Sequence, residues 1–179
     1  MTKSLIIGIS SGIGSALAEE LNNQGHDIHG TTRAIKSDML RGENKQLYYC
    51  DLKSIPSMDK FINSFSSKNS WDNLIVCPAQ MEPIGNFEGT EIDDWLETFN
   101  VNFNSQVYLL HKLLKYKSNK LSRVIFFAGG GVNGVTPNYS CYTTSKIAMI
   151  KLIELLDYEL KDVIFTILGP GWVKTKIHD

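Results

Sequence analysis

A tyrosine and a lysine stand four residues apart in the last quarter of the chain, in the run Tyr142-Thr143-Thr144-Ser145-Lys146. A helix would place both head groups on one face, over the same pocket. A free tyrosine has a pKa of about 10, so only about one phenol in a thousand is ionised at neutral pH. A nearby ammonium lowers that pKa, and the phenol can then give a proton to a carbonyl oxygen or take one from an alcohol. The pair therefore predicts acid–base chemistry, with Tyr142 as the acid/base and Lys146 as the group that tunes it.

A glycine-rich turn follows the first apolar run and leads straight into a helical pattern. Glycines there permit a tight turn, a close approach of backbone N–H groups to a pyrophosphate, and close packing of helix on strand. The N-terminus of the helix adds the positive end of its dipole. Because the turn joins a strand to a helix, it predicts dinucleotide binding more strongly than a merely structural bend. The residues expected to contact the cofactor are Gly8, Ser10, Ser11, Gly12, Ile13 and Gly14.

The end of the second strand is where a dinucleotide-binding fold distinguishes NAD from NADP. An acidic residue there binds the ribose hydroxyl of NAD, whereas an arginine accommodates the 2′-phosphate of NADP. The sequence reads Gly30-Thr31-Thr32-Arg33 at this point, and Asp27 lies at the opposite end of the strand. Arg33 therefore favours NADP, with NAD as the other option and a purely solvated arginine as the structural alternative.

Short apolar runs alternate with longer amphipathic ones along the whole chain, which predicts alternating strands and helices. Several of the strands are continuous apolar runs, typical of a parallel sheet covered on both faces. The pattern predicts one doubly wound α/β domain over residues 1–179, built from right-handed crossovers. The expected strands are Ser4–Ile9, His26–Thr31, Gln46–Cys50, Asn73–Cys77, Arg123–Ala128 and Val163–Leu168, and the expected helices are Ile13–Gln24, Ile55–Ser66, Glu91–Tyr116 and Tyr142–Leu160.

Composition excludes several classes of function. Eighteen basic and nineteen acidic residues leave a net charge of −1, which is unlike a nucleic-acid-binding surface. The apolar runs are far shorter than the ~18 residues of a membrane span, and the N-terminus turns glycine-rich too early for a signal peptide. Cys50, Cys77 and Cys141 have no metal-ligand spacing, and their odd number indicates a reducing compartment. We expect a cytoplasmic protein that binds no nucleic acid, membrane or metal.

The glycine turn and the Tyr-Lys pair together resemble the short-chain dehydrogenase/reductase family, in which a G-x-x-x-G-x-G turn meets a Y-x-x-x-K pair. Matching segments run from about Ser4 to Thr175. The resemblance implies a Rossmann-type three-layer α/β/α fold with strand order 3-2-1-4-5-6, here without the usual seventh strand. It also implies a nicotinamide cofactor, a small carbonyl or alcohol substrate, and a homodimer or homotetramer that pairs through the third and fourth helices.

Four further segments carry the resemblance. Asp51-Leu52, after the third strand, resembles the family's adenine-contacting aspartate, and Cys77-Pro78-Ala79-Gln80 replaces the N-N-A-G segment, keeping only Ala79. Asn102, preceded by Trp95 at the family's spacing, is similar to the asparagine that supports the active-site lysine through water. The last segment, Gly169–Thr175, resembles the P-G-x-x-x-T segment that holds the nicotinamide carboxamide; its matching residues are Pro170, Gly171, Val173 and Thr175.

The sequence departs from the family pattern in two places. The family's catalytic serine, thirteen or fourteen positions before the tyrosine, is replaced by Gly129 or Ala128, and the S-G-G-G pattern of some relatives favours Ala128. Losing one such donor typically costs ~10²–10³ in rate. Substitute donors are expected among the backbone N–H groups of the glycine run or among Ser140, Thr143 and Asn133. Family members also continue several dozen residues further, so this chain is either truncated, open at its pocket, or completed by another subunit.

Three functions remain open at this point. The leading one is an NADP-dependent carbonyl reductase or alcohol dehydrogenase, with Tyr142, Lys146 and Asn102 as catalytic residues. The replaced serine and the short C-terminus favour a catalytically weak NADP(H)-binding sensor or regulatory protein as the runner-up. A sugar-nucleotide epimerase uses similar Tyr-Lys chemistry but needs a larger substrate domain, so it ranks last.

Overall fold

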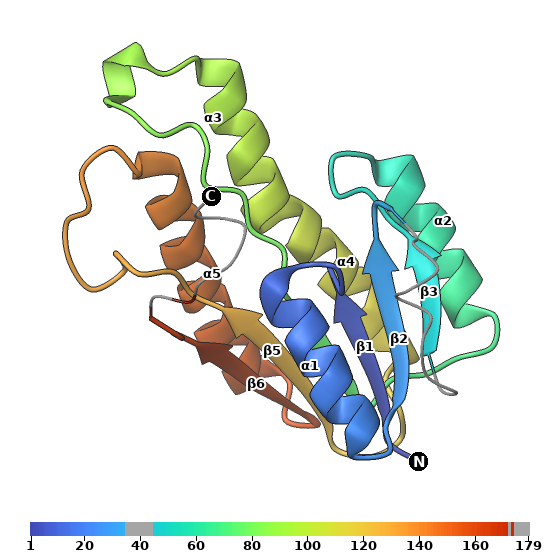
Figure 1. The fold of residues 1–179 in the computed structure, drawn as a ribbon. Coiled ribbons are helices and arrows are strands. Elements are labelled where there is room, and N and C mark those ends of the chain that lie inside the picture. The colour runs from blue at the N-terminus through green and yellow to red at the C-terminus, as the bar shows by residue number, and fades with distance from the viewer. Residues whose placement is uncertain (35–44, 172, 174–179) are drawn as a thin grey trace.

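The computed structural model describes residues 1–34, 45–171 and 173 of the chain. Its six parallel strands form one sheet in the order β3-β2-β1-β4-β5-β6, as predicted (Figure 1). The strand order reverses between β1 and β4, which places the topological switch point of the sheet there. The strands are β1 (Lys3–Ile7), β2 (Asp27–Thr32), β3 (Lys45–Tyr49), β4 (Asn73–Val76), β5 (Ser122–Phe127) and β6 (Val163–Leu168).

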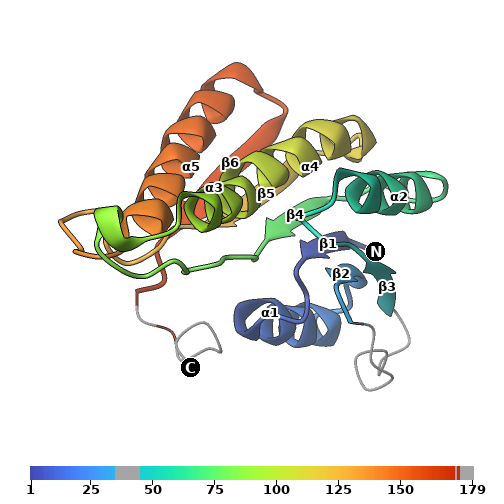
Figure 2. The ribbon, with the colours of Figure 1, turned by 90° about the horizontal axis from the view of Figure 1, so that it is seen from above.

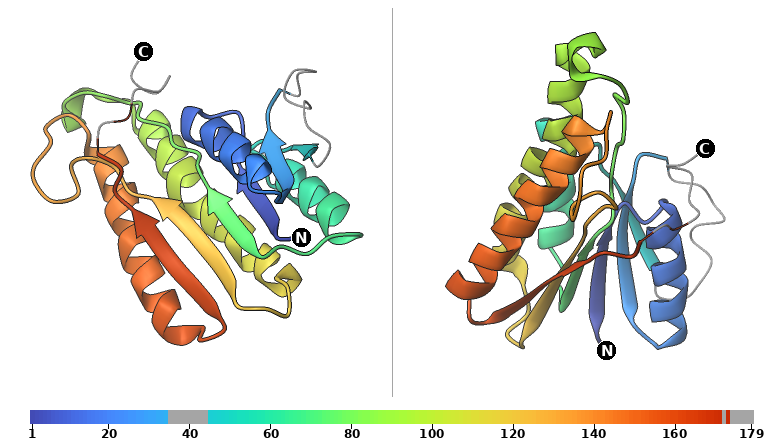
Figure 3. Two further views of the ribbon diagram at one scale, coloured as in Figure 1. Left: turned by 60° about the horizontal axis from the view of Figure 1, so that its bottom comes forward. Right: turned by 90° about the vertical axis from the view of Figure 1, so that its left-hand side faces the viewer.

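Helices cover both faces of the sheet and complete the three layers. Figure 2 shows α1 (Gly12–Asn23) on one face, with α2 (Ile55–Ser66), α4 (Ser105–Leu113) and α5 (Ser140–Glu159) on the other. The side view in Figure 3 shows the same division, with α3 (Ile92–Phe99) on the side of α4 and α5. Two short 3₁₀ segments, η2 (Phe87–Gly89) and η4 (Leu114–Tyr116), precede α3 and follow α4.

The predicted helix over Glu91–Tyr116 is helical along its length but is not a single α-helix. Between α3 and α4 it widens into a π-helical turn, η3 (Asn100–Asn104), which carries Asn102. Such π-helical turns are rare in proteins, and those that do occur are frequently found at functional sites. Hydrophobic periodicity does not distinguish a π turn from an α-helix, so this turn could not be predicted from the sequence pattern. The other predicted boundaries agree with the structure to within two residues.

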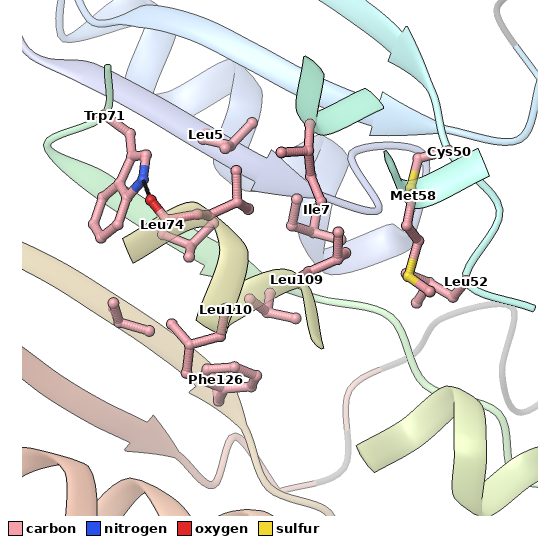
Figure 4. Packing of buried hydrophobic residues seen from close by; sticks show 14 of the residues in the cluster. Leu5, Ile7, Cys50, Leu52, Met58, Trp71, Leu74, Leu109, Leu110 and Phe126 are labelled. Carbon is pink, nitrogen blue, oxygen red and sulfur yellow. Dashed lines mark hydrogen bonds between the residues drawn. The ribbon is translucent and has the colours of Figure 1, made fainter. Parts of the chain in front are cut away.

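Two apolar clusters hold the layers together, one on each face of the sheet. Because successive strand residues point to opposite faces, Leu5 and Ile7 of β1 join the larger cluster and Ile6 joins the smaller one. Trp71 is fully buried in the larger cluster, and its indole Nε1 donates to the backbone oxygen of Leu113 at 2.9 Å (Figure 4). Burial on both faces explains why these strands are continuous apolar runs in the sequence.

Candidate active site

A cleft of about 650 Å³ opens at the carboxyl ends of the central strands, at the switch point of the sheet. Open α/β sheets bind their ligands at this place. It brings together most of the sequence-predicted site residues, namely Gly8, Ser10, Ser11, Gly12, Ile13, Arg33, Asp51, Leu52, Ala79, Tyr142, Lys146, Pro170, Gly171 and Val173. Gly14 and Asn102 do not line the cleft, and Thr175 lies outside the described residues.

Two close contacts, one at Gly8 and one at Gly14, shape the glycine turn. Gly8 has a φ of +74°, and a Cβ there would lie 2.8 Å from Cγ of Pro78. A Cβ at Gly14 would lie 2.5 Å from the backbone oxygen of Gly8, so this glycine lets helix and strand pack closely and does not itself face the cleft. Ser11 caps α1, because its Oγ accepts a hydrogen bond from the N–H of Gly14 at 3.0 Å.

The residues at this end of the cleft fit a dinucleotide. The first N–H groups of a helix have no carbonyl partner within it, and Gly12 and Ile13 hold these positions in α1 while lining the cleft. The first turn of α1 contains no acidic residue, so its positive dipole end is available to an anion. Among the lining residues that the structure describes, Asp51 is the one acid, whereas Arg33, Lys53 and Lys146 are bases.

Tyr142 and Lys146 meet in the cleft, as their spacing predicted. Tyr142 lies in the first turn of α5 and is half-buried, and the Nζ of Lys146 is 5.8 Å from the centroid of its ring. Lys146 is only 4% exposed, and its Nζ donates to the backbone oxygen of Phe127 at 2.9 Å.

The expected lowering of the tyrosine pKa is wrong for this structure. Burial raises the pKa of Tyr142, since it removes water from the charged phenolate. Burial also lowers the pKa of Lys146 to about 8, and the nearby Cys77 thiol only partly offsets this. The lysine therefore keeps its proton at neutral pH but loses it in mildly alkaline solution. Desolvation is the first cause of both shifts, because burial takes the charged form of each group away from water.

Asn102 connects the segment after β4 to the helix that carries the Tyr-Lys pair. Its Oδ1 accepts from the N–H of Gln80 and its Nδ2 donates to the oxygen of Gln80, both at 2.8 Å. The same Nδ2 donates to Oγ of Ser145 at 3.2 Å, and that hydroxyl donates to the backbone oxygen of Tyr142. The side chain is thus fully engaged within the protein. Support of Lys146 through water stays a prediction, and it would have to come from the backbone of Asn102.

The position that faces the phenol is Gly129, rather than the Ala128 that the sequence favoured. A Cβ built on Gly129 would lie 2.4 Å from Cε1 and 2.5 Å from Oη of Tyr142. The tyrosine side chain therefore occupies the space into which a serine at this position would project. The three side chains expected as substitute donors, Ser140, Thr143 and Asn133, do not line the cleft. Ser140 instead accepts a hydrogen bond from Nε1 of Trp95 at 3.1 Å.

The cleft is also lined by residues that sequence reasoning did not assign to the site, and Lys53, Gln80 and Val101 are examples. Lys53 directly follows Asp51-Leu52, so its place in the sequence next to that pair could have indicated that it lines the cleft. Lys53 also forms an ion pair with Glu97 of α3. Gln80 and Val101 line the cleft from the segment after β4 and from the π turn.

Three observations on the described residues concern metal ligands, membrane-spanning helices and cysteines. No group of three histidine, cysteine or acidic side chains is placed to hold a metal ion within this part of the chain. None of its helices combines the length and the apolar character needed to cross a membrane. All three cysteines are buried as free thiols.

Solved structures share this fold at low sequence identity. A short-chain dehydrogenase/reductase of Saccharomyces cerevisiae aligns over 99% of this chain and 73% of its own, with a TM-score of 0.90 and 21% identity. A 3-ketoacyl-(acyl-carrier-protein) reductase from Brucella melitensis, complexed with NADH, aligns over 98% and 78%, with a TM-score of 0.88 and 18% identity. These likenesses concern the arrangement of the sheet and helices.

Sequence relatives and a family model give a more specific result. The human dehydrogenase/reductase SDR family member 2, mitochondrial, is 26% identical over 96% of this chain and 65% of its own length. The 11-beta-hydroxysteroid dehydrogenase-like 4A of Arabidopsis thaliana is 30% identical over 95% and 60%. The chain thus spans somewhat less than two thirds of the length of both proteins. The model of the short chain dehydrogenase family matches residues 3–179. With this match over nearly its whole length, the chain belongs to the short-chain dehydrogenase family of oxidoreductases.

Proposed function

We propose that this protein is an NADP(H)-dependent oxidoreductase that reduces a small carbonyl compound to an alcohol. The observation that carries the proposal is that Tyr142 and Lys146 line the same cleft as the N-terminus of α1 and Arg33. Family membership supports a nicotinamide cofactor, and one neighbouring structure is a complex with NADH. The choice of NADP, the substrate and the residue roles are parts of the proposal.

The proposed roles follow from where each side chain lies. When bound, the nicotinamide supplies the hydride that a carbonyl carbon accepts. Tyr142 gives a proton to the carbonyl oxygen; burial raises its pKa, so the phenol holds the proton that this step requires. Lys146 places a positive charge beside the phenol and stabilises the phenolate left after proton transfer. Asn102 keeps α5 and the segment after β4 in place.

Tyr142→Phe tests the acid role directly. The variant keeps the ring but removes the proton, so we expect kcat to fall ~10²–10⁴-fold while the Kd of the cofactor stays unchanged. The measurement is a cofactor titration followed by turnover of a panel of ketones and aldehydes. Undiminished turnover by the variant would exclude Tyr142 as the acid.

Cofactor preference is tested at Arg33. An arginine that holds a 2′-phosphate contributes a charge-assisted hydrogen bond worth about 1.5–3 kcal/mol, so Arg33→Ala should raise the Kd of NADPH more than about tenfold. The Kd of NADH, which lacks that phosphate, should change little. Equal effects on both cofactors would remove the argument for NADP.

A second candidate function is a sensor or regulatory protein that binds NADP(H) without efficient turnover. The observation that favours it is Gly129, which leaves the site without the family's serine hydroxyl. Tight cofactor binding with no turnover across the carbonyl panel would support this function over the first.

The assembly and location of the protein are separate proposals. Large apolar side chains on α5, including Ile147, Leu155 and Tyr158, are exposed in the single chain, which supports the homodimer or homotetramer implied by the family resemblance. Light scattering on the purified protein measures the oligomeric state directly. The cytoplasmic location stays a prediction from composition; the human relative is named as mitochondrial.

A further inference from the structure

Three buried side chains, spaced four residues apart along the α3–η3–α4 run, bond to the backbone of the segment Pro78–Glu82. Gln106 Nε2 donates to the oxygen of Pro78 at 2.9 Å, and Asn102 exchanges two hydrogen bonds with the backbone of Gln80. Thr98 Oγ1 donates to the oxygen of Glu82. The exposed fractions of Thr98, Asn102 and Gln106 are 0%, 0% and 1%. Every fourth helical residue thus meets every second residue of the segment, and we call this set of bonds the side-chain ladder.

The ladder bonds to the residues on either side of Ala79, since Gln106 bonds to Pro78 and Asn102 bonds to Gln80. Ala79 itself lines the cleft, so these bonds hold the backbone next to a cleft-lining residue.

The two ends of the ladder connect to elements that form the active site. At the inner end, the ring of Pro78 lies against Gly8 so closely that a Cβ on this glycine would meet it at 2.8 Å. At the outer end, the segment continues from Glu82 to Gly85, whose N–H donates to the oxygen of Asn138 at 2.9 Å. Asn138 lies just before α5, which begins at Ser140 and carries the Tyr-Lys pair.

We propose that Gln106 and Thr98 are positioning residues that set the cofactor side and the catalytic side of the cleft, respectively. Gln106 fixes Pro78 and Ala79 against the glycine turn, so its loss should weaken cofactor binding. Thr98 fixes the part of the segment that leads to the start of α5, so its loss should slow turnover. The kinetic part of this proposal rests on the proposed function, whereas its structural part does not.

The test compares Gln106→Met and Thr98→Val, which remove the polar groups at nearly constant volume, with Thr98→Ser, which keeps the hydroxyl. We expect Gln106→Met to raise the Kd of the cofactor about tenfold, because it leaves a buried carbonyl without its donor. Thr98→Val should lower kcat about tenfold with less than a threefold change in that Kd, and Thr98→Ser should restore kcat. Amide hydrogen exchange across residues 78–82 should speed up in Gln106→Met and Thr98→Val.

Ser122→Ala is the matched control. Its hydroxyl is 0% exposed and donates to the backbone oxygen of Lys120, at the end of the sheet opposite the cleft. The control should lower the melting temperature without changing Kd or kcat. If Gln106→Met and Thr98→Val behave like the control, the ladder is only structural and the proposal is overturned. Should Gln106→Met not fold, Gln106→Asn, which shortens the reach of the amide, replaces it in the same comparison.

The exchange measurement separates this proposal from the proposed function. If the wild-type protein binds no nicotinamide cofactor, the proposed function fails, yet faster exchange across residues 78–82 in the variants still supports the ladder. If the cofactor binds and the exchange rates stay at their wild-type values, the ladder fails while the proposed function stands.

Discussion

Gly129 is the position where one added carbon atom tests the geometry of the active site most directly. A Cβ there would lie 2.4 Å from Cε1 and 2.5 Å from Oη of Tyr142. Non-bonded carbon atoms rest about 3.5–4.0 Å apart, so Gly129→Ala must push the phenol away by about 1 Å. The matched control is Gly130→Ala, since a Cβ at Gly130 meets no heavy atom within 4 Å.

The expected sizes of the two effects follow from this displacement. A misplacement of about 1 Å at the reacting group can cost about 10²-fold, so we expect Gly129→Ala to lower kcat by about that factor. Gly129→Ser displaces the phenol equally but adds a hydroxyl donor, and such a donor to a developing oxyanion is worth ~10²–10³ in rate. The serine variant should therefore exceed the alanine variant by about 10²-fold and approach the wild-type kcat.

The assay is the oxidation of the reduced cofactor with the best ketone of the panel, in all four proteins. Cofactor Kd and melting temperature are measured alongside, so that loss of folding or of cofactor is not mistaken for loss of chemistry. Equal kcat values for Gly129→Ala and Gly130→Ala would refute the placement of the phenol against position 129. Equal values for the serine and alanine variants would refute the role given to the missing hydroxyl.

Three further outcomes are expected. Because burial lowers the pKa of Lys146 from 10.5 to about 8, the unfolded chain binds the extra proton between these pH values. The unfolding free energy of wild type minus that of Lys146→Met should therefore rise with pH over this range, by up to about 1.4 kcal/mol per pH unit; a flat difference in urea titrations would contradict the shift. Gly14→Ala drives a Cβ to 2.5 Å from the oxygen of Gly8. It should cost about 1–3 kcal/mol and weaken cofactor binding more than about tenfold, and an unchanged Kd would argue against the role of the glycine turn. Trp71→Phe leaves the oxygen of Leu113 buried without its donor, so urea denaturation should show a loss of about 1–3 kcal/mol; a neutral result would mean that this bond contributes nothing.

Local sequence patterns were enough to predict the fold and the general location of the site. Strands buried on both faces are continuous apolar runs, and helices show their own period, so the alternation of elements could be read from local pattern. The glycine turn and the Tyr-Lys pair are also local, since each depends on the spacing of residues within one turn or one helix. Their meeting in one cleft follows from the order of the strands, because parallel strands end at one edge of the sheet.

Features that depend on contacts between distant segments could not be predicted from local patterns and emerge from the folded structure. Counting back from Tyr142 left Ala128 and Gly129 as alternatives, and the packing of the phenol selected Gly129. Charge spacing predicted a lowered pKa for Tyr142, whereas burial raises it, because desolvation depends on the surrounding layers and not on the neighbouring residue in the helix. The bond from Gln106 to Pro78 joins residues 28 positions apart, and no local periodicity records such a pairing.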